Sequence, residues 1–145
     1  MKKIDVKYFK HGYLQPIELK KISVGDWIDL SSAVTIHMKK GEFKLIPLGV
    51  GMVLPKGYEA LVVPRSSTFK RYNIIMTNSI GIIDNSYCGN ADEWHFPAYA
   101  IDDCEIVRGD RIAQFRVVKN QPSIMFNVVD RLADVSRGGF GSTGR

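Results

Sequence analysis

Apolar and polar residues alternate with a period of two along most of this chain. In the stretch 33–38, Val34, Ile36 and Met38 fall on one side of an extended backbone and polar residues fall on the other. Such alternation is typical of strands that bury one face. The pattern predicts strands at 33–38, 43–48, 50–54, 58–63, 74–77, 80–83, 96–101, 104–107, 112–118 and 124–129.

Turn residues separate these predicted strands. Lys40-Gly41-Glu42 and Pro55-Lys56-Gly57 indicate turns, and 108–111 indicates a tight turn that leads into a strand. The one helical window is short, at 66–71, with Ser66 or Ser67 as its N-cap. Many short strands with glycine and proline turns predict an all-β sandwich, jelly roll or barrel.

The C-terminal residues differ in composition from the rest of the chain. Four glycines after Arg137 surround one aromatic ring, Phe140, and two hydroxyls. Glycine frees backbone N–H groups to hold phosphate oxygens, arginine adds charge, and an aromatic ring can cover a planar base. The chain is therefore predicted to form one core domain, 1–133, followed by a flexible arm, 134–145, that becomes ordered over a ligand.

Charge and cysteine content narrow the class of partner. Lys and Arg number 20 against 15 Asp and Glu, a formal charge of +5, which favours an anionic partner such as nucleic acid, a membrane surface or a phosphorylated small molecule. The two cysteines form no CxxC pair and no disulfide framework, which is consistent with a cytoplasmic protein. We see no signal peptide or membrane-spanning segment and expect no membrane partner.

Two segments in the first half of the chain contain residues suited to cation or anion binding. Asp29 is expected just before a strand, where its carboxylate could support a divalent cation directly or through water, or could cap a turn. Arg65, Ser66 and Ser67 lie where a strand enters the short helix. There they could bind an anion, cap the helix, or do both.

Two later segments combine apolar strands with isolated polar residues. Asp84 ends an apolar run and could act as a general base on water, while Tyr87 could pack on a sugar. The hairpin backbone nearby could pair with a base, although a surface hairpin with Asp84 in its turn is the alternative. Gln114, on the same predicted strand face as Ile112, is either a buried amide with a partner or a ligand contact.

In this order and spacing, the segments resemble the trimeric dUTPase family over residues 25–145. The matching motifs are Pro-Arg-Ser-Ser, Gly-Ile-Ile-Asp-x-x-Tyr-x-Gly, Gly-Asp-Arg-Ile-Ala-Gln and Arg-Gly-Gly-Phe-Gly-Ser-Thr-Gly, with Trp-Ile-Asp-Leu as a looser first motif. The Glu-Trp-His-Phe-Pro-Ala-Tyr-Ala stretch is similar to a subgroup in Gram-positive bacteria and their phages.

The resemblance implies a jelly-roll or distorted β-barrel homotrimer whose C-terminal arms cross to neighbouring sites. The implied reaction splits dUTP into dUMP and pyrophosphate with Mg²⁺, and Asp84 directs water onto the α-phosphorus. The resemblance implies that Asn78 and the backbone from Gly81 to Ile83 bind uracil, that Phe140 covers the base, and that Tyr87 packs on the deoxyribose. The residues implied to bind phosphates are Arg65, Ser66, Ser67 and Gln114. Those implied to bind the γ-phosphate end are Arg137, Gly141, Ser142 and Thr143. Asp29 would support the metal through water.

The chain departs from the family pattern in three places. Many relatives have glycine where this chain has Ser67. Most relatives carry Asp where this chain has Ser86, which changes charge and hydrogen bonding beside the expected base. The connection 90–95 is longer than usual and places Trp94 and His95 near the expected sugar site. Trp94 is therefore a second candidate for stacking on the substrate, after Phe140.

Three other functions remain open from the sequence. A dCTP deaminase on the same fold would need a catalytic glutamate, for which Glu93 is the nearest candidate. A non-catalytic trimer could bind a regulatory protein partner. A nucleic-acid-binding barrel fits the charge, but aromatic residues do not alternate with Lys and Arg on one strand face, so no nucleic-acid partner is expected.

Overall fold

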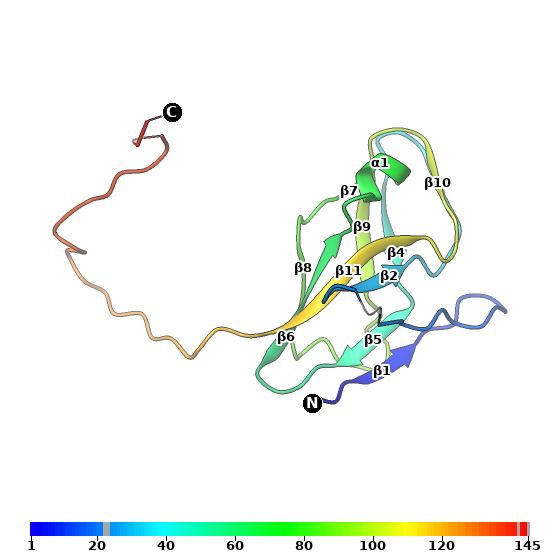
Figure 1. Ribbon diagram of the computed structural model, residues 1–145, viewed down its shortest axis with the longest axis horizontal. Helices are drawn as coiled ribbons and strands as arrows, with labels where there is room; N and C mark the ends of the chain where they lie inside the picture. The colour runs from blue at the N-terminus through cyan, green and yellow to red at the C-terminus, as the bar shows by residue number, and fades with distance from the viewer. Residues whose placement is uncertain (22–23, 142, 145) are drawn as a thin grey trace.

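The computed structural model describes residues 1–21, 24–141 and 143–144. Within these residues the chain forms short strands and one short helix (Figure 1). The elements are β1 (Asp5–Tyr8), β2 (Ile28–Ser31), β3 (Ile36–Met38), β4 (Phe43–Pro47), β5 (Val50–Val53), β6 (Tyr58–Pro64), α1 (Thr68–Tyr72), β7 (Ile74–Met76), β8 (Gly81–Ile83), β9 (His95–Ala100), β10 (Cys104–Ile106) and β11 (Arg111–Lys119). The all-β prediction is confirmed.

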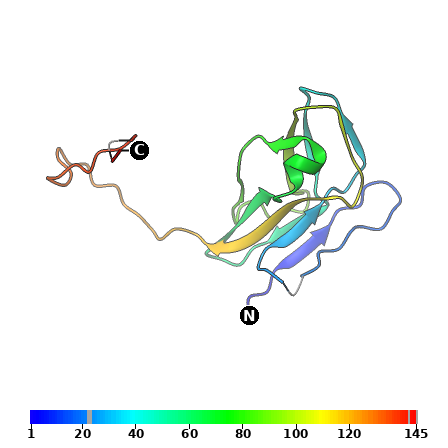
Figure 2. The same ribbon diagram turned by 45° about the horizontal axis from the view of Figure 1, so that its top comes forward.

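The strands pair antiparallel in four small sheets. The largest has the order β2-β11-β6-β8, a second has the order β4-β9-β7, and two ribbons pair β1 with β5 and β10 with β3. Figures 1 and 2 show these sheets enclosing one body, with α1 at one end and β1 along one side. The order of the largest sheet places β8 at its edge, where one side of its backbone pairs with no strand of the described residues.

The interior is filled by the inward-facing residues of these strands. Leu30, Ile46, Phe96 and Ile112 have no exposed surface. Trp94 is also buried, and its ring meets that of Phe115 edge to face, with centroids 5.2 Å apart. Edge-to-face contact is a preferred aromatic geometry. Trp94 is thus a core residue, and the expectation that its ring stacks on a ligand is wrong.

The helix lies close to its predicted position. It begins at Thr68 after the N-cap Ser67 and ends at Asn73, which adopts a left-handed conformation with φ of 54°. The Ser67 side chain forms no capping hydrogen bond. Thr68 instead anchors this end, because its buried hydroxyl donates to the Ile112 carbonyl at 2.7 Å and accepts from the Arg65 N–H at 2.9 Å.

The predicted strands agree with the observed ones between residues 36 and 119 to within a few residues, but the two ends of the chain differ. Strand β1 was not predicted, because an exposed edge strand such as Asp5–Tyr8 needs no apolar face. The predicted strand at 124–129 is wrong: these residues form no strand, and Phe126 and Val128 are almost fully exposed. Regular structure ends at Lys119, before the predicted domain boundary at 133.

After β11 the chain leaves the body as an extended segment (Figure 1). Within the described part, residues 120–141 contain neither helix nor strand. Among the described residues, no helix has the length and apolar character that a membrane span requires.

Candidate active site

A pocket of approximately 440 Å³ opens beside the edge strand β8. It brings together five residues predicted for the base, the sugar and the water: Asn78, Gly81, Ile83, Asp84 and Tyr87. The other lining residues are Leu45, Ile82, Ser86, Glu93, Trp94, His95 and Pro97. Two separate loops and the strands β4, β8 and β9 therefore build one cavity around the predicted chemistry.

The base-reading part of this pocket is the edge of β8. Gly81 pairs with Val62 of β6, so only the opposite side of the β8 backbone is available to a ligand. A side chain at position 81 would place its Cβ 3.3 Å from the Val62 Cβ, which is a tight contact. The close packing explains why glycine suits this position and keeps the strand near Asn78.

Asp84 lies just after β8 with its carboxylate exposed. The Ser86 hydroxyl and the Ser86 N–H, the latter at 2.7 Å, both donate to Asp84 Oδ1. These two hydrogen bonds hold the pKa of Asp84 below its usual value, because they stabilise the carboxylate. Asp84 is thus ionised at neutral pH, with Oδ2 available for a water molecule.

The Tyr87 phenol is fixed at the other side of the pocket. Its hydroxyl donates to the Glu93 main-chain carbonyl at 2.8 Å. Partial burial, followed by the nearby Asp92 and Glu93 charges, raises the pKa of Tyr87, so the phenol stays neutral. The intervening Asn85 donates to the carbonyls of Leu54 and Pro55, which ties the Asp84–Tyr87 turn to the loop before β6.

The residues predicted to bind phosphate gather at a second place, where α1 begins beside β2 and β11. Arg65 Nε lies 3.0 Å from Asp29 Oδ1, and Arg111 Nη1 lies 3.1 Å from Asp29 Oδ2. Gln114 is half-buried and donates to the Pro64 carbonyl at 3.2 Å. Ser66 and Ser67 lie next to this cluster in the turn that precedes α1.

Asp29 occupies a different position from the one expected. It lies within β2 rather than before a strand, and each of its carboxylate oxygens pairs with an arginine. No group of three or more His, Cys, Asp and Glu residues suited to a metal occurs in the described part of the chain. The direct effect of Asp29 is therefore to orient two guanidinium groups.

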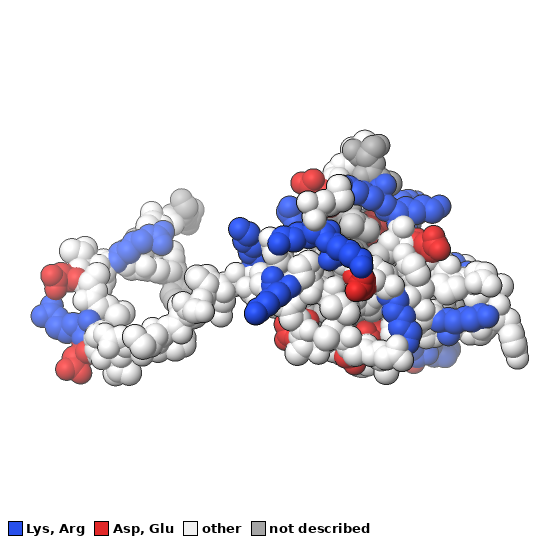
Figure 3. Space-filling model, turned by 90° about the horizontal axis from the view of Figure 1, so that it is seen from below, with Lys and Arg blue, Asp and Glu red and all other residues white. Residues whose placement is uncertain are grey.

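On the face seen in Figure 3, Lys and Arg side chains are spread over the body and acidic side chains lie among them. Charge on this face is mixed, as on many proteins that do not bind nucleic acid. Arg65 and Arg111 differ from isolated surface cations because a common carboxylate holds them.

The arm residues lie away from both places. Arg137, Phe140, Gly141 and Thr143 belong to the extended C-terminal segment, and the Phe140 ring is fully exposed. Ser142 lies outside the described residues. The described geometry therefore brings Arg137, Phe140, Gly141 and Thr143 to neither the pocket nor the arginine cluster.

Glu93 and His95 adjoin the pocket through backbone and ring atoms. The Glu93 carboxylate is buried and turned toward the N-terminal segment, where Oε2 lies 2.7 Å from His11 Nε2 and accepts from the Gly49 N–H at 2.9 Å. This placement does not favour Glu93 as the catalytic glutamate of a deaminase. His95 Nδ1 lies 2.8 Å from the Glu93 carbonyl.

Sequence reasoning missed several residues that shape the site. Ser86 was noted only as a departure, although a hydroxyl two residues after Asp is a recognisable turn signal. Asn85 and Thr68 anchor the two loops, and Arg111 shares Asp29 with Arg65. No local pattern identifies the contact between His11 and Glu93, because it joins residues that are 82 positions apart.

Known proteins agree with this fold and these motifs. A sequence model of the dUTPase family matches residues 24–144. The SPbeta prophage-derived deoxyuridine 5'-triphosphate nucleotidohydrolase YosS of Bacillus subtilis (strain 168) is 53% identical over 141 residues, which cover 97% of each chain.

Two solved phage structures share the fold. A mutant dUTPase of Staphylococcus bacteriophage 80alpha with dUpNHpp superposes with a TM-score of 0.77 at 19% identity, covering 99% of both chains. A mutant dUTPase from phage phi11 of S. aureus, described with a structural Mg(II) ion, has a TM-score of 0.73 at 17% identity, covering 88% of this chain and 97% of that one. With the family match spanning most of its length, the chain belongs to the dUTPase family.

Proposed function

We propose that this protein hydrolyses dUTP to dUMP and pyrophosphate, with Asp84 as the general base. The observation that carries the proposal is the single pocket that unites an edge strand, a neutral phenol and an ionised carboxylate. Asp84 Oδ2 accepts a proton from water as the water oxygen attacks the α-phosphorus. The bond from that phosphorus to the bridging oxygen breaks, and pyrophosphate leaves.

The same pocket accounts for selection of the nucleoside. Uracil pairs with the free backbone edge of β8 and with Asn78, which together offer donors and acceptors in a fixed arrangement. Tyr87 packs on the deoxyribose and leaves no room for a 2′-hydroxyl. Because these groups are held before substrate arrives, binding needs little rearrangement.

The triphosphate needs cations that this pocket does not provide. No Lys or Arg is among the described residues that line it, whereas Arg65 and Arg111 are held together by Asp29 at the start of α1. Positioned guanidinium groups stabilise the charge that develops in phosphoryl transfer. A complete site therefore combines the pocket of one copy with the arginine cluster of another, where Arg65, Ser66, Ser67 and Gln114 bind phosphates.

A homotrimer with sites at its subunit junctions meets this requirement. The outer face of the β4-β9-β7 sheet is apolar: Phe43, Tyr99 and Ile75 lie in register across it, and each is at least 40% exposed. Leu45 and Pro97, the next row of this face, line the pocket itself. A second copy seated on this face buries the apolar row and lies next to the pocket.

Mg²⁺ fits this site as an ion bound mainly by the substrate. The ion commonly keeps several waters and takes one or two carboxylates together with phosphate oxygens, so it needs no cluster of protein ligands. Asp29, through water, is the protein contact that we propose. An ion held in this way would neutralise phosphate charge.

The C-terminal arm completes the site from a neighbouring copy. Arg137, Gly141, Ser142 and Thr143 bind the γ-phosphate end, and Phe140 covers the uracil. The extended course of residues 120–141 away from their own body supports this role, because the segment is free to reach another subunit (Figure 1).

Parallel assays against dUTP, dCTP, dTTP and UTP with Mg²⁺ test the proposed function. Pyrophosphate and dUMP should form from dUTP with a marked preference over the other three nucleotides. Ammonia release from dCTP would instead identify a deaminase. Light scattering should report a trimer of the 16.3 kDa chain, and a monomer that hydrolyses dUTP would contradict the shared site.

A further inference from the structure

Glu93 joins three parts of the molecule through a single residue. Its carboxylate, 10% exposed, contacts His11 Nε2 at 2.7 Å and the Gly49 N–H at 2.9 Å. Its main-chain carbonyl accepts the Tyr87 hydroxyl at 2.8 Å. The N-terminal segment, the β4–β5 turn and the sugar side of the pocket are thus connected at one position.

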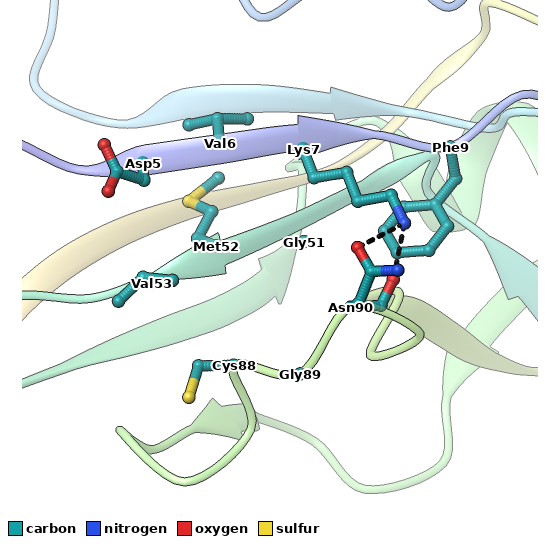
Figure 4. A pocket seen from close by; sticks show the side chains of 10 residues that line it. All are labelled: Asp5, Val6, Lys7, Phe9, Gly51, Met52, Val53, Cys88, Gly89 and Asn90. Atoms are coloured by element: carbon teal, nitrogen blue, oxygen red, sulfur yellow. Dashed lines mark hydrogen bonds between the residues drawn. The ribbon is translucent and has the colours of Figure 1, made fainter.

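His11 belongs to a segment that is fastened to this loop at two points. Lys7 Nζ donates to the Asn90 carbonyl at 2.6 Å and to its side-chain oxygen at 2.9 Å, as Figure 4 shows. Behind these contacts the loop lies against β5 so closely that a Cβ at Gly51 would be 2.7 Å from the Asp92 carbonyl oxygen. His11 itself lies outside residues 24–144, which the family model matches.

Two groups converge on the same atom of Glu93. The Gly49 N–H donates to Glu93 Oε2, and His11 Nε2 lies 2.7 Å from that oxygen, so the side chain is held by both the β4–β5 turn and the N-terminal segment. Trp94 N–H donates to the Val50 carbonyl at 2.8 Å and holds the peptide group that follows Glu93. The side chain on one side and this backbone bond on the other fix the orientation of the carbonyl that receives the Tyr87 phenol.

We propose that Glu93 and His11 are a positioning pair that fixes the Tyr87 ring and thereby sets the discrimination between deoxyribo- and ribonucleotides. The proposal rests on the function proposed above, in which Tyr87 packs on the sugar. Neither residue of the pair touches the reacting atoms. Their effect should therefore fall on selectivity and leave the turnover of dUTP little changed.

Kinetic selectivity tests the pair in the full-length protein. In His11→Ala the ratio of kcat/KM for dUTP to that for UTP should fall about tenfold, the effect of one lost charge-assisted hydrogen bond on a positioned group. The kcat for dUTP should change little. Glu93→Gln, which keeps an acceptor for both donors, should retain most of the selectivity that Glu93→Ala loses.

A matched control and a double variant sharpen this test. His37→Ala removes a comparable pair with Glu105, at 3.3 Å, but on the exposed β3-β10 ribbon, and should leave the ratio unchanged. Tyr87→Phe removes the phenol itself, so adding His11→Ala to it should cause no further loss of selectivity. An unchanged ratio in His11→Ala, or full additivity with Tyr87→Phe, would overturn the proposal.

A second readout does not depend on catalysis. With 3-fluorotyrosine incorporated, the Tyr87 fluorine resonance is assigned by its absence in Tyr87→Phe. It should shift in His11→Ala without nucleotide and stay in place in His37→Ala. A Tyr87 resonance that does not shift in His11→Ala would overturn the proposal that Glu93 and His11 position Tyr87. A wild-type protein that does not hydrolyse dUTP would overturn the proposed function instead.

Discussion

The Ser86 hydroxyl donates a hydrogen bond to Asp84 Oδ1, which also accepts the Ser86 N–H. One carboxylate oxygen is thus occupied within the turn itself, and the other accepts no hydrogen bond from the described residues. The arrangement orients the proposed base and keeps it ionised.

Replacing this hydroxyl should alter the pH dependence of the reaction. The hydrogen bonds lower the pKa of Asp84 from 3.8, so the active carboxylate persists as the pH falls. Ser86→Ala removes one donor, raises that pKa, and should shift the acid limb of the kcat/KM profile for dUTP to higher pH. A profile that stays in place, or moves to lower pH, contradicts this role for Ser86.

Asp84→Asn tests the base directly. Loss of a general base should lower kcat by roughly a hundredfold or more. Binding of a non-hydrolysable dUTP analogue, measured by calorimetry, should remain close to that of the wild type because the amide preserves the shape of the side chain. Normal turnover in this variant would assign proton transfer to another group.

Asp29→Asn should disturb phosphate binding and stability together. Asp29 and Arg65 are largely buried, with 18% and 24% of their side chains exposed, so loss of both ion pairs should cost about 1–2 kcal/mol in the free energy of unfolding. KM for dUTP should rise because Arg65 is no longer held. Asp5→Asn, which removes an ion pair with side chains 88% and 69% exposed, is the control and should change neither quantity.

Deleting residues 135–145 should lower the activity and leave the folded body intact. The thermal midpoint should be unchanged, because the segment lies outside the body. The value of kcat/KM should fall roughly thirtyfold or more, since a lost base stack and a lost arginine–phosphate contact each cost about 1–3 kcal/mol. Mixed trimers of the truncated chain and the Asp84→Asn chain should be more active than either alone. Absence of such recovery would argue that each arm serves its own subunit.

Phe43→Asp tests the proposed subunit contact. A charge placed on the apolar face of the β4-β9-β7 sheet would be buried without a partner, at a cost of roughly 3 kcal/mol or more. Light scattering should then show dissociation. Val107→Asp, at a similarly exposed position after β10, should leave the trimer intact. If both variants remain trimeric, the interface lies elsewhere.

Local patterns predicted most of the strands but only part of the site. Alternation located β6 closely, because Ala60 and Val62 bury one face of that strand within the same chain. The same signal was misleading at 124–129, where apolar residues have no partner in a single copy. An alternating apolar pattern indicates that one face of a segment needs to be buried, and it does not say whether the same chain or another copy covers that face.

Five residues of the pocket, Asn78, Gly81, Ile83, Asp84 and Tyr87, were predictable because they lie within one short segment of the sequence. The ion-pair partners of Asp29 could not be predicted in this way. The two arginines lie 36 and 82 positions further along the chain, and they meet Asp29 only because β2, β6 and β11 pair with one another. Trp94 shows the opposite error, since it was considered for stacking on the substrate whereas its ring fills the core beside Phe115.

The unpaired side of β8 has an evolutionary consequence. Peptide groups are the same for every residue except proline, so most exchanges of Ile82 leave the proposed recognition surface chemically unaltered. Gly81 is constrained by its closeness to Val62, and Ile83 by its packing against the core. A lineage that changed its preferred nucleobase would have to reshape the hairpin by insertion or deletion, a rarer event than a point substitution.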